Sequence, residues 1–161
     1  YESLGVAAVI SPWNYPLATP VTSAAEALLA GNSVVLKPSE HTPLTVLLIK
    51  EIWDKSIEFK DSFQIVIGDG NVGQIIVESN NIDIVCFTGS TAVGKKIALE
   101  CARTLKPHIL ELGGKDPMIV LKDANINRSV ESALFGGMSN AGQTCISTEE
   151  VFIEDSILLL F

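Results

Sequence analysis

Cysteine, basic residues and long apolar runs are all scarce in this sequence, and each shortage excludes a class of protein. The three cysteines are an odd number without paired spacing, which suggests neither a disulfide framework nor a zinc ribbon and fits a reducing, cytoplasmic environment. Lys and Arg total 11 against 19 Asp and Glu, and the net charge of -8 argues against nucleic acid as a partner. No apolar run approaches the roughly 20 residues that cross a bilayer, so no membrane partner is expected.

Apolar residues are abundant by contrast. They make up 47% of the 161 positions, and the mean hydropathy is +0.36. This composition predicts a folded chain with a substantial core. Apolar runs also stand near both ends, at residues 4–10 and 157–161. Because natural domains seldom end on a bare apolar run, the sequence predicts an internal piece of a longer protein.

Short apolar runs alternate with segments of helical period over the first two thirds of the chain. The expected strands are residues 5–10, 33–36, 63–67, 82–87 and 108–112, and the expected helices are residues 17–29, 44–53, 72–77 and 93–102. Continuous apolar strands separated by helices predict a parallel sheet covered on both faces, which is an α/β doubly wound fold. Thr42 is expected to cap the second helix, with Pro43 in its first turn.

The pattern changes after Gly113-Gly114. A strand is expected at residues 118–121, a helix at 126–138 and a further strand at 151–153. The chain shows no internal repeat beyond the strand–helix alternation and no low-complexity segment.

Two glycine-rich loops suggest nucleotide binding, and neither is decisive. Residues 68–73 read Gly-Asp-Gly-Asn-Val-Gly, which matches G-x-G-x-x-G between a strand and a helix. The acidic residue expected about 20 positions later is missing, since Asp83 comes too early. A tight strand-to-helix turn explains this loop as well as phosphate contact does.

The second loop, residues 89–96, is almost a Walker A loop. It lacks the final Ser or Thr whose hydroxyl would hold magnesium, which counts against a nucleoside triphosphatase. Ser90 can instead cap the following helix, whose free N–H groups could face an anion.

Five motifs occur in a fixed order along the chain. They are Pro12-Trp13-Asn14, Lys37-Pro38-Ser39-Glu40, Phe87-Thr88-Gly89-Ser90, Glu111-Leu112-Gly113-Gly114 and Gly142-Gln143-Thr144-Cys145. Together they resemble the aldehyde dehydrogenase superfamily, and the resemblance covers essentially the whole chain. It implies a Rossmann-like NAD-binding domain over residues 1–112, truncated at its N-terminus. Residues 113–161 would be the first part of an α/β catalytic domain, truncated at its C-terminus.

The resemblance assigns catalysis to Cys145, Glu111 and Asn14. A Cys145 thiolate would add to an aldehyde carbonyl and give a thiohemiacetal, then a thioester after hydride transfer. The Asn14 amide and the Cys145 backbone N–H would stabilise the oxyanion. Glu111 would activate water against the thioester, with its pKa raised by partial burial. Asn14 could otherwise be an Asx cap for the helix near Pro16.

The other two cysteines and the two histidines receive no chemistry. Cys86 and Cys101 lie in an apolar strand and a helix, and we interpret them as buried small hydrophobes. His108 is interpreted as a structural residue and His41 as a loop residue.

The resemblance also places the cofactor. The expected cofactor-binding residues are Ile10, Ser11, Pro12, Trp13, Lys37, Ser39, Glu40, Gly70, Gly73, Phe87, Thr88, Gly89, Ser90, Val93, Gly94, Leu112 and Gly113. Lys37 and Glu40 would bond the adenosine ribose, and the Glu40 carboxylate would repel a 2′-phosphate. NAD is therefore preferred over NADP, although Lys37 could compensate. No metal is implied.

The predicted activity is oxidation of an aldehyde to a carboxylic acid with NAD(P), by a protein that the family suggests is a homo-dimer or homo-tetramer. Three alternatives stay open: a catalytically silent NAD-binding fragment, a P-loop nucleotide-binding protein and a CoA-dependent acylating enzyme. The particular aldehyde is not defined by these residues.

Overall fold

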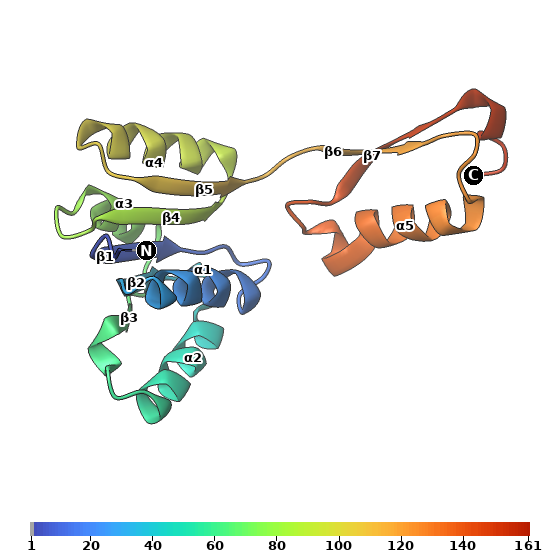
Figure 1. The fold of residues 1–161 in the computed structure, drawn as a ribbon. Coiled ribbons are helices and arrows are strands. Elements are labelled where there is room, and N and C mark those ends of the chain that lie inside the picture. Colours follow the sequence, from blue (N-terminus) through green and yellow to red (C-terminus); the bar gives the residue numbers. More distant parts are fainter. Residues whose placement is uncertain (1) are drawn as a thin grey trace. The chain divides into compact units, whose positions relative to one another are not determined.

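A computed structural model describes residues 2–161, and the chain divides into two compact units. The first unit ends at Leu112 and the second is Gly113–Phe161. The helices and strands of both units are labelled in Figure 1.

The first unit is built on a five-stranded parallel sheet. Its strands are β1 (Val6–Ile10), β2 (Ser33–Lys37), β3 (Phe63–Ile65), β4 (Ile84–Gly89) and β5 (His108–Leu112). They lie in the order β3-β2-β1-β4-β5, and every neighbouring pair is parallel. The predicted doubly wound α/β fold is thus confirmed. The strand order reverses between β1 and β4, which is the topological switch point of the sheet.

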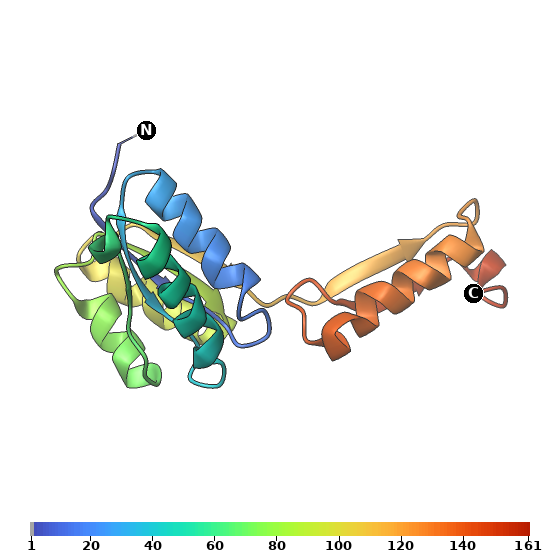
Figure 2. The same ribbon diagram turned by 90° about the horizontal axis from the view of Figure 1, so that it is seen from below.

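Four helices cover the two faces of this sheet (Figure 2). They are α1 (Ala18–Leu29), α2 (Pro43–Ser56), α3 (Gly70–Glu78) and α4 (Thr91–Arg103). One apolar core contains buried residues of α1 and α2 against the sheet, and a separate core contains those of α3 and α4. The central strands β1, β2 and β4 are therefore buried between two helix layers, which explains their continuous apolar runs, whereas the edge strand β5 has no fully buried residue.

Two of the four helices in this unit, α3 and α4, begin at a residue whose side chain caps them. Ser90 caps α4, because its Oγ accepts a hydrogen bond of 3.3 Å from the backbone N–H of Val93. Asp69 caps α3 by accepting from the N–H groups of Asn71 and Val72, so this helix begins two residues before the predicted start at residue 72. Thr42 is the N-cap of α2, yet it makes no side-chain cap bond, contrary to the expected cap.

The second unit is a single strand–helix–strand motif. Strand β6 (Asp116–Val120) pairs in parallel with β7 (Thr148–Ile153), and α5 (Ile126–Met138) connects them. Asn125 caps α5 by accepting a 3.1 Å bond from the N–H of Arg128. No residue of α5 is fully buried. Short 3-10 turns complete the described chain: η1 (Lys60–Ser62), η2 (Ser139–Gly142) and η3 (Asp155–Ile157).

Within residues 2–161, the helices are all too short or too polar to cross a membrane.

Candidate dinucleotide site and catalytic residues

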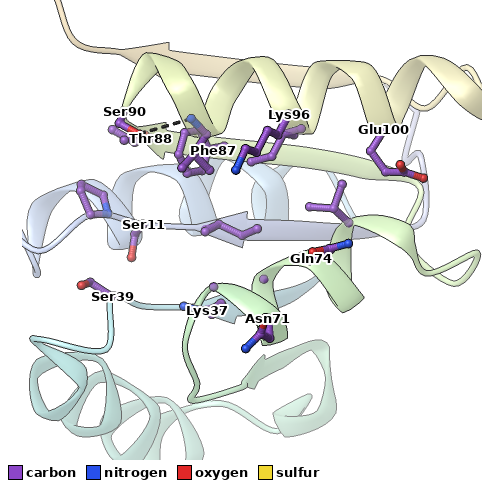
Figure 3. A pocket seen from close by; sticks show the side chains of 18 of the residues that line it. Ser11, Lys37, Ser39, Asn71, Gln74, Phe87, Thr88, Ser90, Lys96 and Glu100 are labelled. Carbon is purple, nitrogen blue, oxygen red and sulfur yellow. Dashed lines mark hydrogen bonds between the residues drawn. The ribbon is translucent and has the colours of Figure 1, made fainter.

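A cavity of about 950 Å³ lies inside the first unit, at the carboxyl ends of β1, β2 and β4. Open parallel sheets bind ligands in the crevice at the switch point, which here is the gap between β1 and β4. One face of α3 and one face of α4 continue the cavity walls away from the sheet edge (Figure 3). The topology therefore creates this cavity from segments that are distant in the sequence.

Most of the residues predicted to bind a cofactor line this cavity. They are Ile10, Ser11, Pro12, Trp13, Lys37, Ser39, Glu40, Gly70, Gly73, Phe87, Thr88, Gly89, Ser90 and Val93. The remaining predicted residues, Gly94, Leu112 and Gly113, are not among the lining residues. Gly94 instead brings α4 close to β5, because a Cβ at this position would lie 2.5 Å from Cδ2 of Leu112.

Another part of the cavity lining consists of residues that the sequence motifs do not predict. These residues are His41, Asn71, Gln74, Val77, Glu78, Lys96, Ile97, Leu99, Glu100 and Arg103. Except for His41, all belong to α3 or α4. Figure 3 shows Gln74 and Lys96 on opposite sides of the cavity. Extending the helical face that contains Gly73, and that which contains Val93, at spacings of three and four would have found most of them.

At one end of the cavity, the start of α4 can face an anion. Thr88, Gly89 and Ser90 line the cavity there, and the helix begins directly at Thr91. The first N–H groups of a helix have no intrahelical acceptor and favour negative charge. Because the helix follows Ser90 at once, no extended Walker A loop surrounds this point.

Lys37 and Ser11 form a polar wall between β1 and β2. Lys37 is 4% exposed, and its Nζ donates a 3.1 Å hydrogen bond to the carbonyl of Pro38 and lies 3.9 Å from the Glu40 carboxylate. Ser11 is 5% exposed, and its Oγ has no hydrogen-bond partner among the described residues. A buried hydroxyl without a partner is costly, so it marks a position where a polar ligand would be favoured.

The Gly-x-Gly-x-x-Gly loop leads directly into the start of helix α3. Asp69 occupies the cap position, and a Cβ at Gly68 would lie 2.3 Å from the Val72 side chain, so Gly68 is required for the tight turn. Gly73 faces the aliphatic stem of Lys37, with 3.6 Å from its hypothetical Cβ to Cδ of Lys37. The loop thus combines a tight turn with two glycines, Gly70 and Gly73, in the cavity wall.

The three predicted catalytic residues fall in different units. Asn14 and Glu111 belong to the first unit, and Cys145 belongs to the second. Asn14 follows β1, and the N-cap residue of α1 is Leu17. Glu111 pairs in register with Thr88, a cavity residue, but it is exposed. The partial burial expected for Glu111 is therefore not found within the described residues.

Cys145 differs from the other two cysteines in exposure. Cys145 is exposed, whereas Cys101 is buried and Cys86 is partly buried. Burial raises the pKa of the Cys101 thiol, an effect that the Lys106 ammonium opposes. Burial, and to a lesser extent the Glu26 carboxylate, raises the pKa of the Cys86 thiol. Since the thiolate is the nucleophile, Cys86 and Cys101 are poor candidates for nucleophilic attack.

The sheet order and the cavity at its switch point are those of the dinucleotide-binding α/β proteins. The sequence model of the "Aldehyde dehydrogenase family" matches residues 1–161. The chain belongs to the aldehyde dehydrogenase family.

Individual relatives agree with this assignment. The chain is 45% identical over 154 residues to a putative succinate-semialdehyde dehydrogenase [NADP(+)] of Mycolicibacterium smegmatis, covering 95% of this chain and 29% of that protein. It is 39% identical to a betaine aldehyde dehydrogenase of Vibrio vulnificus, covering 95% and 32%. A Bacillus cereus aldehyde dehydrogenase in complex with NAD⁺ superposes with a TM-score of 0.96 at 38% identity, covering 99% and 33%. The chain thus spans about a third of the length of these relatives.

Proposed function

We propose that this chain supplies the dinucleotide site and the catalytic cysteine of an NAD(P)-dependent aldehyde dehydrogenase, which oxidises an aldehyde to a carboxylic acid. The observation that carries the proposal is the cavity at the β1–β4 switch point, lined by most of the residues that the sequence motifs predict. Membership of the aldehyde dehydrogenase family supports it.

The residues of the cavity fit a dinucleotide. The start of α4 at Ser90 would face the diphosphate, and Lys37 and Glu40 would bond the adenosine ribose. The unpartnered Oγ of Ser11 would gain a hydrogen bond from such a ligand. When bound, the cofactor supplies a hydride acceptor.

The choice between NAD and NADP turns on Glu40 and Lys37. The Glu40 side chain is 50% exposed at the cavity edge, where its charge would repel a 2′-phosphate, while the buried Lys37 ammonium would attract one. We propose NAD as the preferred cofactor, with NADP as the alternative that Lys37 permits. The relative from Mycolicibacterium smegmatis is named for NADP(+), so both cofactors belong in the test.

Cys145 would perform the covalent chemistry. Its thiolate sulfur forms a bond to the aldehyde carbon, and the carbonyl oxygen takes the negative charge. The side-chain amide of Asn14 and the backbone N–H of Cys145 would donate hydrogen bonds to that oxygen. Loss of hydride then oxidises the thiohemiacetal to a thioester on Cys145.

Glu111 would complete the turnover. It accepts a proton from water as the water oxygen bonds to the thioester carbon, and the carbon–sulfur bond then breaks to release the acid and the Cys145 thiolate. This role requires Glu111 to approach Cys145 in the complete protein. Attack by the thiol of CoA in place of water would make the enzyme an acylating one.

The decisive experiment measures the turnover of the full-length protein. The aldehyde panel includes succinate semialdehyde and betaine aldehyde, each with NAD and with NADP, and the product acid is quantified. Cys145→Ala should abolish acid formation, whereas Cys101→Ala, a matched cysteine control, should retain it. Glu111→Gln should keep an initial burst of NADH and lose its continuation.

Specific outcomes would contradict parts of this proposal. Normal turnover by Cys145→Ala would exclude the cysteine mechanism, and normal turnover by Glu111→Gln would exclude Glu111 as the base. NAD binding with neither turnover nor alkylation of Cys145 would indicate a silent NAD-binding protein. Preferential magnesium-dependent binding of ATP would favour a nucleoside triphosphatase.

We further propose that the protein acts in the cytoplasm as a homo-dimer or homo-tetramer. The odd cysteine count without paired spacing supports the reducing compartment, and the family resemblance supports the assembly. Light scattering of the full-length protein measures its mass in solution, and a monomer would contradict the proposed assembly.

A further inference from the structure

Lys106 joins the C-terminal ends of two helices. Its Nζ donates a 2.8 Å hydrogen bond to the carbonyl of Val77 and a 2.7 Å bond to that of Ser79, at the end of α3. Its own backbone N–H donates a 2.9 Å bond to the carbonyl of Cys101, in the last turns of α4. One residue therefore ties α3 to α4 across 27 to 29 positions of sequence.

The turn after α4 aims Lys106 at α3. Leu105, just before Lys106, has a left-handed backbone with φ of 55°, which is rare for a residue with a side chain. Its N–H bonds the carbonyl of Ala102, and together with the Lys106–Cys101 bond it closes the end of α4 in the manner of a Schellman turn. The exposed Leu105 thus accepts an unfavourable conformation that directs the next side chain inward.

The two helices that Lys106 connects are walls of the cavity. Residues of α3 from Gly70 to Glu78 and residues of α4 from Val93 to Arg103 line it. Val77, whose carbonyl accepts a bond from Lys106, is itself a lining residue. These hydrogen bonds of Lys106, called the Lys106 clamp below, therefore lie at the end of the cavity away from the sheet edge, whereas Ser90 starts α4 at that edge.

The end of α3 depends on this clamp for physical reasons. The helix has nine residues, and short helices are marginal without tertiary support. Its last carbonyls have no intrahelical donor, and a cation at a helix C-terminus is favourable. Removing the ammonium leaves the Val77 and Ser79 carbonyls without this partner and frees the end of α3 to move.

We propose that Lys106 is a positioning residue that fixes the spacing of α3 and α4 and thereby sets the affinity of the cavity for the adenosine half of the dinucleotide. The inference rests on the proposed function of this cavity as the cofactor site. It assigns no contact between Lys106 and the ligand, because Lys106 acts through the backbone of α3.

The test compares Lys106→Met, which keeps the aliphatic stem and removes the ammonium, with Lys106→Arg, which keeps a charged donor. Lys60→Met, on the exposed η1 turn, controls for the loss of one positive charge. Calorimetric titrations with AMP and with NAD use the full-length protein, at a temperature where circular dichroism shows every variant folded. Turnover at saturating NAD is measured in parallel.

We expect Lys106→Met to weaken AMP and NAD binding about tenfold, or about 1.4 kcal/mol. The turnover number at saturating NAD should stay unchanged, and Lys106→Arg should recover most of the affinity. A lower melting temperature with unchanged dissociation constants would show a merely structural role and overturn the inference. Failure of the unchanged protein to bind AMP or NAD would instead contradict the cofactor site itself, and the inference with it.

Discussion

The two units of this chain bury their apolar residues to very different extents. In the first unit, Val46 and Val85 are completely buried, on opposite faces of the sheet. In the second unit, Leu134 and Phe135 of α5 are 58% and 78% exposed, and α5 has no buried residue. The first unit thus forms its cavity from its own contacts, whereas the proposed nucleophile lies in a unit with little core of its own.

This difference separates two parts of the proposed function. The cavity walls come entirely from the first unit, so the dinucleotide site depends on contacts that the structure describes. The proposed chemistry would require Asn14 and Glu111 of the first unit to act on a group bonded to Cys145 of the second. Substitutions in the two units can test this separation.

Asn14→Ala should impair chemistry without impairing cofactor binding. Loss of one oxyanion donor typically lowers kcat about 100- to 1000-fold. Because Asn14 is not among the lining residues of the cavity, the dissociation constant for NAD should change little. Steady-state kinetics and calorimetry of the full-length protein measure both, with Asn81→Ala as a surface control. A kcat within twofold of the unchanged protein would remove Asn14 from the mechanism.

Leu36→Ala and Leu134→Ala should differ sharply in their effect on stability. Leu36 is 1% exposed within the core of the first unit, and such truncations cost about 2–5 kcal/mol. Leu134 is exposed on α5, where truncation typically costs less than about 0.5 kcal/mol. Urea unfolding of the full-length protein measures both. Equal costs would show that Leu134 is buried in the full-length protein.

Gly94→Ala and Gly70→Ala provide a matched pair of helical glycines. A Cβ at Gly94 would lie 2.5 Å from the Leu112 side chain, whereas a Cβ at Gly70 would meet nothing within 4 Å. Overpacking costs about 1–3 kcal/mol, and the gain in helix propensity offsets part of it at Gly94 inside α4 but is smaller at Gly70, the first residue of α3. The unfolding free energy of Gly94→Ala should therefore fall below that of Gly70→Ala by somewhat less than this amount. Equal values would mean that Leu112 moves aside without cost.

Ala141→Gly should stabilise the second unit slightly. Asn140 and Ala141 lie on η2, a few residues before Cys145, and have left-handed φ angles of 52° and 58°. Glycine adopts this backbone without the steric cost of a Cβ, so we expect a gain of about 0.5–1 kcal/mol in the unfolding free energy. Ala133→Gly, within α5, should lose a similar amount and serves as the control. If both substitutions destabilise, the left-handed turn carries no strain.

Much of the secondary structure followed from the sequence, and the reasons are local. The strand His108–Leu112 and the helix Ile126–Met138 have the predicted bounds, because apolar periodicity and turn residues set them. The start of α3 differs from the prediction because the Asp69 side chain caps the helix, which the apolar periodicity beginning at Val72 does not reveal. The exposure of Glu111 was also missed, since burial depends on what packs against a strand and not on the strand itself.

The sequence alone determined that this chain alternates strands and helices, that five motifs of one enzyme family occur in order, and that Cys145 stands apart from Cys86 and Cys101. Only the tertiary structure decided that β1 lies beside β4, that α3 and α4 face each other across the cavity, and that Lys106 holds the end of α3. The physical reason is the distance along the sequence over which each interaction acts. Propensity and periodicity act over a few residues, whereas strand order and the Lys106 clamp join segments that only the folded chain brings together.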